Sequence, residues 1–135
     1  MTTIHLDVEF WPVIVTRPEH GKVTDAELER YLSDYRTAIR TRHERYVGVL
    51  DLRDNNSGIT PAQRKMLTSA MQEDSASYSL CAGVAMVINS GLLRGMLTAI
   101  LWIRKPPVTM EVFTSFDEAM EWSRAQLVGQ RDAQR

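Results

Sequence analysis

The sequence lacks most of the features that mark enzymes and disulfide-stabilised proteins. A single cysteine, Cys81, excludes an internal disulfide, and its apolar neighbours favour a small buried side chain over a reactive thiol. The three histidines, His5, His20 and His43, are scattered, and no cysteine or histidine stands at zinc-ligand spacing. The glycine-rich phosphate loops and the nucleophile elbow of common enzymes are also missing. These absences predict a protein that is not an enzyme and that uses no metal or cofactor.

An excess of one charge and long hydrophobic runs are equally lacking. The 135 residues carry 16 basic and 17 acidic side chains, so no strongly basic surface is available to attract nucleic acid. The longest apolar stretch, residues 92–103, is interrupted by Arg94 and Thr98. It is shorter than the roughly 18 residues of a membrane-spanning helix. The N-terminus also lacks the basic start and apolar run of a signal peptide. We therefore expect a cytoplasmic protein with no nucleic acid partner and no membrane insertion.

The chain has the length of one ordinary domain, and its 44% hydrophobic content is enough to fill a single core. We assign that domain to residues 1–128. The remaining segment, 129–135, is polar and shows no periodicity, so we expect it to be a flexible tail.

Hydrophobic periodicity predicts strands that alternate with helices. Residues 4–10 alternate apolar with polar side chains and are followed by the apolar run 13–15, which predicts an antiparallel hairpin over residues 4–17. The remaining predicted elements are strands at 47–50, 83–88 and 108–113, a helix at 92–103, and three helices that begin at the capping patterns Thr24–Glu27, Thr60–Gln63 and Ser115–Glu118. This order predicts an α/β fold, with a mainly parallel sheet of about five strands, an antiparallel N-terminal edge strand and about four helices.

The tripeptide Asn-Ser-Gly occurs twice, each time between an apolar run and a predicted helix. Loops at the carboxyl ends of parallel strands are common ligand and regulatory sites. The first copy lies in a candidate phosphorylation or partner loop, which consists of Asp54, Asn55, Asn56, Ser57 and Gly58. Ordinary turn formation explains the same residue types, and Asp51 with Asp54 could alternatively serve as a base or as Mg²⁺ ligands.

The second copy offers a candidate anion-binding site made of Ser90, Gly91 and Arg94. Ser90 is a natural helix cap, and Arg94 follows one turn later, within reach of an anion at that helix end. A simple cap beside a solvated arginine is the alternative. If consecutive strands are neighbours in the sheet, the two loops lie side by side and line one shallow site.

The predicted helix at 92–103 is apolar over an arc of roughly 200°, more than packing on a sheet requires. Its candidate interface residues are Leu93, Leu97, Leu101 and Trp102. A protein partner, a second copy of the chain or a lipid-like ligand would cover this surface, and burial under neighbouring helices is the alternative. Trp122 raises the same question, because it lies off the apolar stripe of the last predicted helix.

The element order and the run Val47-Gly48-Val49-Leu50-Asp51-Leu52, leading to Asn56-Ser57-Gly58, resemble the STAS family of anti-sigma-factor-antagonist (SpoIIAA-like) domains. In that family a similar strand leads to Asp-Ser-Ser-Gly, whose second serine is phosphorylated by a partner kinase. Ser57-Gly58 takes that place here, while Asn55 and Asn56 replace the aspartate and the first serine. Gln63-Arg64-Lys65 and Leu93-Arg94-Gly95 are more similar to an uncharacterised bacterial subgroup, for which no activity is implied.

The resemblance implies a non-enzymatic bacterial regulatory module that binds a protein partner, with a homodimer as one possibility. A small apolar ligand-binding or lipid-binding domain is the alternative, since some proteins of that subgroup are related in fold to lipid-carrying domains.

Overall fold

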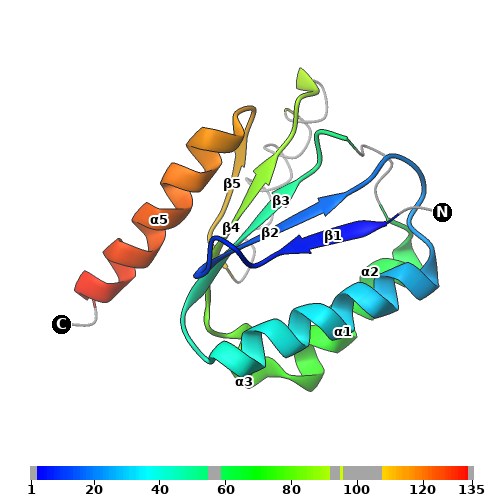
Figure 1. Cartoon of the computed structure of the whole chain (residues 1–135), viewed down its shortest axis with the longest axis horizontal. Helices are drawn as coiled ribbons and strands as arrows, with labels where there is room; N and C mark the ends of the chain where they lie inside the picture. The colour runs from blue at the N-terminus through cyan, green and yellow to red at the C-terminus, as the bar shows by residue number, and fades with distance from the viewer. Residues whose placement is uncertain (1–2, 55–58, 92–94, 96–107, 134–135) are drawn as a thin grey trace.

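The chain begins with a β-hairpin, and each later strand adds to the same sheet in sequence order (Figure 1). The computed structural model describes residues 3–54, 59–91, 95 and 108–133. Within these ranges the strand order is β1-β2-β3-β4-β5, with β1 antiparallel to β2 and the other neighbours parallel. The elements are β1 (Ile4–Asp7), β2 (Val13–Pro18), α1 (Asp25–Arg42), β3 (Tyr46–Asp51), α2 (Pro61–Glu73), α3 (Ser75–Tyr78), β4 (Cys81–Val87), β5 (Met110–Phe113) and α5 (Phe116–Ala133). The predicted α/β fold with an antiparallel N-terminal edge strand is confirmed.

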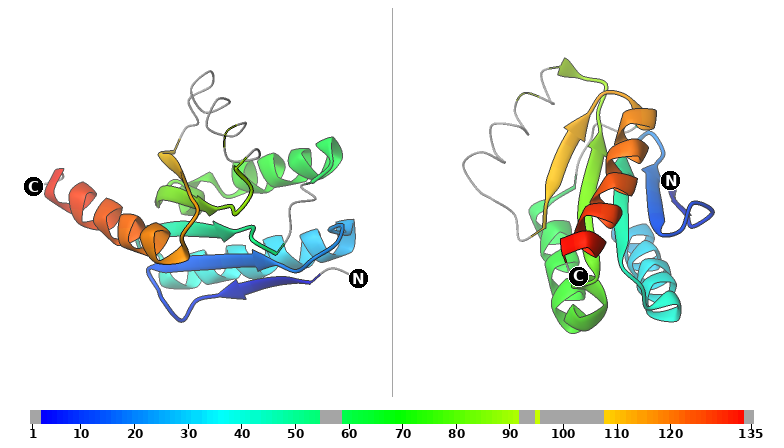
Figure 2. Two further views of the ribbon diagram at one scale, coloured as in Figure 1. Left: turned by 90° about the horizontal axis from the view of Figure 1, so that it is seen from above. Right: turned by 90° about the vertical axis from the view of Figure 1, so that its left-hand side faces the viewer.

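Helices cover both faces of the sheet: α1, α2 and α3 lie on one face, and α5 lies on the other (Figure 2). Strand β2 contributes side chains to the apolar layers on both faces of the sheet. Val13 and Val15 pack in the cluster that contains Ala119 of α5, whereas Ile14 packs with Ile39 of α1. Because alternate side chains of β2 enter two apolar layers, the sequence of this strand is a continuous apolar run and does not alternate between apolar and polar residues. No helix among the described residues combines the length and apolar character needed to cross a membrane.

The helix caps also join elements that are distant in sequence. Thr60 and Gln63 form the predicted capping box. The side-chain amide of Gln63 also donates to the Val23 carbonyl at 2.7 Å. At the start of α1, Thr24 Oγ1 accepts from the Glu27 amide as predicted. The Glu27 carboxylate does not complete that box, because it accepts from the Ile4 amide at 3.0 Å and pairs with Arg30. Glu27 thus fastens α1 to the edge strand instead of capping the helix.

Several boundaries differ from the predictions. The first strand ends at Asp7 rather than near residue 10, and the short helix α3 was not predicted. Helix α5 continues to Ala133, because Gly129 is followed by residues that helices accept readily. The domain limit at residue 128 stays a prediction. The predicted helix at 92–103 lies outside the described residues apart from Gly95.

Trp122 is accounted for by packing within the chain. It is half-buried, and its ring centroid lies 5.8 Å from that of Phe113 on β5. Its indole also rests on Gly83 of β4, where a Cβ would stand 3.0 Å from Trp122 Cη2 and 3.2 Å from the Thr109 carbonyl oxygen. Of the two alternatives left open for Trp122, the structure shows burial within the chain, because the hydrogen atom of Gly83 leaves the space that the indole fills.

This close contact predicts that Gly83→Ala destabilises the fold. The added methyl group meets a packed ring and a backbone carbonyl that accepts from the Val84 amide, so neither neighbour can withdraw freely. We expect the free energy of unfolding to fall by about 1–3 kcal/mol, as for other overpacked cores. Urea denaturation followed by circular dichroism measures this change.

Gly48→Ala on β3 is the matched control. A Cβ at Gly48 would stand 3.6 Å from Tyr35 Oη and 4.0 Å from Val84 Cγ2, which are ordinary contact distances. We expect it to leave stability unchanged or to raise it by roughly 0.5 kcal/mol through the lower entropy of the unfolded chain. Equal stability losses in both variants would contradict this account of Gly83.

Candidate functional site

The carboxyl ends of β3 and β4 lie side by side and form the start of both Asn-Ser-Gly loops. Asp51 is in register with Val87, and the Leu52 amide donates to the Val87 carbonyl at 2.9 Å. Beyond the strands, the Asn89 side-chain amide donates to the Arg53 carbonyl at 3.3 Å. The expectation that the two strand exits are adjacent is therefore confirmed for the residues that the structure describes. We call this edge the carboxyl rim and define it by Arg17, Asp51, Arg53, Asn89 and Phe116.

A buried carboxylate organises the carboxyl rim. Asp51 is 2% exposed and accepts hydrogen bonds from Arg17 Nε at 2.9 Å and from Arg53 Nε and Nη2 at 2.9 and 2.8 Å. Burial alone would raise the pKa of Asp51, but the hydrogen bonds from Arg53 and Arg17 outweigh it, and the pKa of Asp51 is lowered. Asp51 therefore stays ionised, and its carboxylate oxygens are hydrogen-bonded to two guanidinium groups.

The two arginines share a platform on α5. The guanidinium carbons of Arg17 and Arg53 each lie 5.5 Å from the centroid of the Phe116 ring, within the range of cation–π attraction. Both side chains are 40% exposed, so each presents part of its guanidinium group at the surface. The carboxyl rim thus holds two arginines in place without burying them.

The charge on the carboxyl rim is nearly balanced. The pKa of Arg53 is raised, first by its hydrogen bonds to Asp51 and then by the nearby charges of Asp54 and Asp117. With three carboxylates beside two guanidinium groups, the described part of this edge is not a concentrated positive site. Among the described residues, no three His, Cys, Asp or Glu side chains come close enough to hold a metal ion.

The structure describes some of the predicted site residues. Asp54 lies in an exposed turn after β3, Ser90 is half-buried, and Gly91 is exposed. The other candidates lie outside the described residues and stay predictions; they are Asn55, Asn56, Ser57, Gly58, Leu93, Arg94, Leu97, Leu101 and Trp102.

Sequence reasoning missed Arg17 and Phe116 as members of this site. Arg17 lies 34 positions before Asp51, and only the parallel pairing of β2 with β3 brings the two together. Phe116 is an apolar residue at the start of the last helix, and nothing in the sequence indicates that cations stack on it. Asp51 itself carried a usable signal, because it is an acidic residue at the end of an apolar strand run.

Comparisons with known proteins agree with this architecture. A family model described as SpoIIAA-like matches residues 14–124. A solved structure from Shewanella loihica PV-4, described as an uncharacterized protein of the DUF3478 family with a SpoIIAA-like fold, superimposes with a TM-score of 0.66. That similarity covers 90% of this chain and 93% of the other at 13% sequence identity, so it shows the shared fold alone. No curated protein matches the sequence.

The buried position of Asp51 predicts that Asp51→Asn lowers stability at neutral pH. The amide keeps the shape of the side chain but removes the charge that two guanidinium groups share. We expect a loss of about 1–3 kcal/mol, limited by the ability of the exposed arginines to bind water. Urea denaturation at pH 7 measures the loss. Asp34→Asn is the control, because Asp34 makes an exposed ion pair on α1 and should change stability by less than about 0.5 kcal/mol.

The pH dependence gives a second check with a defined sign. Because the pKa of Asp51 in the folded state lies below its ordinary value of 3.8, its ionised form stabilises the fold above that pH. The stabilisation is lost as the pH falls through the folded-state pKa. The stability difference between native protein and Asp51→Asn should therefore be largest near neutral pH and shrink below about pH 4. A difference that grows on acidification would contradict this assignment.

Proposed function

The chain belongs to the SpoIIAA-like family, and from this premise we propose that it is a non-enzymatic regulatory module that binds another protein through the carboxyl rim. The observation that carries the proposal is the arrangement around Asp51. One buried carboxylate holds two half-exposed arginines on Phe116, beside the exits of two adjacent strands. Such a surface holds its arginines through several contacts and carries directional hydrogen-bond donors. Protein recognition sites of moderate polarity use such groups.

The chemistry of Asp51 supports a binding role over a catalytic one. A general base must hold a pKa near the working pH and must reach the proton that it abstracts. Asp51 has a lowered pKa, and both of its oxygens accept hydrogen bonds from arginines. The carboxylate therefore acts as an anchor for Arg17 and Arg53.

The proposed interface includes the segment Asp54–Gly58 and the predicted helix at 92–103. Ser57 follows Arg53 by four positions, and a phosphate in this loop would attract the guanidinium groups that now share Asp51. We therefore propose Ser57 as the modified residue and Ser90, Gly91 and Arg94 as an anion-binding group. The partner is a second protein or a second copy of the chain, in the bacterial cytoplasm.

Partner capture tests the proposal. Tagged native protein and Ser57→Asp are incubated with extract of the source cell, cross-linked, and compared by quantitative mass spectrometry. We expect at least one partner whose recovery changes by about tenfold, because a charge introduced in the loop alters an interface by an amount comparable to an ion pair.

Ser69→Asp is the matched control, since Ser69 is exposed on α2 and lies outside the carboxyl rim. Its partner set should equal that of the native protein. Sedimentation of the purified protein at several concentrations identifies a partner that is a second copy of the chain. If native protein, Ser57→Asp and Ser69→Asp recover the same partners in equal amounts, and none of them self-associates, the proposal is wrong.

A further inference from the structure

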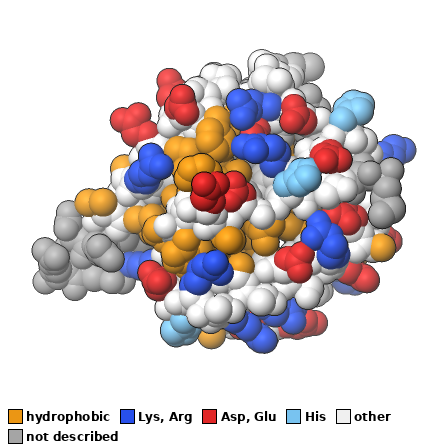
Figure 3. All heavy atoms as spheres, viewed as in Figure 1, with side chains coloured by type: hydrophobic (Ala, Val, Ile, Leu, Met, Phe, Trp, Pro, Cys, Tyr) orange, Lys and Arg blue, Asp and Glu red, His pale blue; other side chains and the backbone are white. Residues whose placement is uncertain are grey.

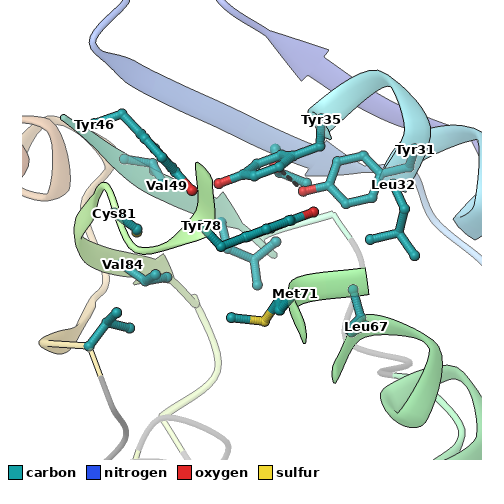
Figure 4. Close-up of a pocket in the computed structure, with 14 residues that line it drawn as sticks. Tyr31, Leu32, Tyr35, Tyr46, Val49, Leu67, Met71, Tyr78, Cys81 and Val84 are labelled. Atoms are coloured by element: carbon teal, nitrogen blue, oxygen red, sulfur yellow. Dashed lines mark hydrogen bonds between the residues drawn. The ribbon is translucent and has the colours of Figure 1, made fainter. Parts of the chain in front are cut away.

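The sheet face that carries α1, α2 and α3 contains a cavity that the carboxyl rim does not use (Figure 4). Its volume is about 190 Å³, and its described walls come from the sheet and from all three helices. The walls are mainly apolar, and none of the described lining residues carries a lysine, arginine, aspartate or glutamate side chain. Along these described walls a ligand would meet no formally charged side chain, which favours a neutral molecule.

All four tyrosines of the chain line this cavity. Tyr35 stacks on Tyr78 with an interplanar angle of 13° and a centroid separation of 5.8 Å. Tyr46 meets Tyr35 edge-on at 6.1 Å, and Tyr31 is tilted against Tyr35 at 5.8 Å. The rings form one continuous aromatic wall from α1 to the start of β3. Flat aromatic ligands pack well against such a wall, because offset and edge-on ring contacts add to the burial of apolar area.

The hydroxyl groups on this wall are not equally satisfied. Tyr31 Oη bonds Thr16 Oγ1 at 2.7 Å. Within the part of the chain that the structure describes, the Tyr46 and Tyr78 hydroxyls are buried and make no hydrogen bond of good geometry, and the closest polar interaction of the Tyr46 hydroxyl is with Tyr35. Tyr46 is completely buried, and its hydroxyl points toward the hydroxyl end of Tyr35 in Figure 4. A buried hydroxyl without a partner destabilises a fold, so its presence here marks a place for an external partner.

The tyrosine hydroxyls of this cavity act as hydrogen-bond donors. Burial raises the pKa of Tyr31, Tyr35, Tyr46 and Tyr78, so all four stay protonated across the physiological range. Burial likewise raises the pKa of Cys81 in the same wall, which keeps that thiol neutral. Because no hydrogen bond of good geometry from the described residues engages the Tyr46 hydroxyl, this protonated phenol offers its O–H to a ligand oxygen.

We propose that this cavity binds a small neutral aromatic molecule that carries one hydrogen-bond-accepting group, such as a carbonyl. The ring packs on the wall formed by Tyr35 and Tyr78, and the oxygen accepts from the Tyr46 hydroxyl. The size fits, because an apolar protein cavity of about 150 Å³ accommodates benzene, and the larger volume here leaves space for a short substituent. This cavity is distinct from the carboxyl rim, so the test of ligand binding is independent of the test of partner binding.

Two probe molecules of similar shape test the proposal by isothermal titration calorimetry. Acetophenone carries a carbonyl, and isopropylbenzene has the same branched outline without an acceptor. We expect native protein to bind acetophenone about fivefold more tightly, which is the contribution of one hydrogen bond from a buried donor.

Two variants locate the binding. Tyr46→Phe should abolish the preference for acetophenone, and its melting temperature should equal or exceed that of native protein, because it removes an unsatisfied hydroxyl. Gly48→Ala places a methyl group in the cavity at ordinary contact distances from Tyr35 and Val84. It should weaken both probes by about tenfold, as one extra carbon does in a closely fitting pocket.

Ser123→Ala is the control, because Ser123 is buried under the opposite face of the sheet and its hydroxyl bonds the Ala119 carbonyl. It should bind both probes as native protein does. The proposal is overturned if acetophenone does not bind native protein up to its solubility limit. It is also overturned if the two probes bind equally well, or if Tyr46→Phe and Gly48→Ala leave both affinities unchanged.

Discussion

The rest of the structure depends on the burial of both faces of the parallel strands. Once α5 covers one face and α1 to α3 cover the other, the central strands can hold polar side chains only where partners neutralise them. Asp51 stands at the end of β3 on the α5 face and is almost completely buried. It is tolerated there because two arginines reach it, one from the neighbouring strand and one from its own loop. The carboxyl rim is thus a consequence of sheet burial.

The α5 face and the opposite face of the sheet are packed with different kinds of side chain. This difference in packing distinguishes the two proposed sites. On the α5 face, small residues allow close approach, as where the Trp122 indole rests on Gly83. On the opposite face, Gly48 lies under Tyr35 with space left over, and rigid aromatic rings span the gap between sheet and helices. Flat rings with few rotatable bonds cannot follow an irregular surface as aliphatic chains do. The tightly packed face therefore holds the side chains of the carboxyl rim, which is the proposed binding edge, and the aromatic face retains a cavity.

Local sequence patterns predicted the elements well where the determining contacts are close in sequence. The hairpin, the parallel strands and the starts of three helices were anticipated, and the Thr60–Gln63 capping box was correct in both of its bonds. The same pattern at Thr24–Glu27 was only half correct. The Glu27 carboxylate instead contacts the Ile4 amide and Arg30, neither of which belongs to the capping motif. Tertiary contact overrode the local pattern at the point where α1 meets the edge strand.

The amino-acid sequence by itself determined the fold class, the order of the strands and the position of the strand exits. These features follow from alternation, helical periodicity and capping residues, which act over a few neighbouring positions. The tertiary structure alone decided which side chains meet: Arg17 with Asp51, both arginines with Phe116, and four tyrosines around one cavity. Those contacts join residues from different elements, because strand register and helix placement set them. Register and placement come from packing the whole core at once, which no short stretch of sequence encodes.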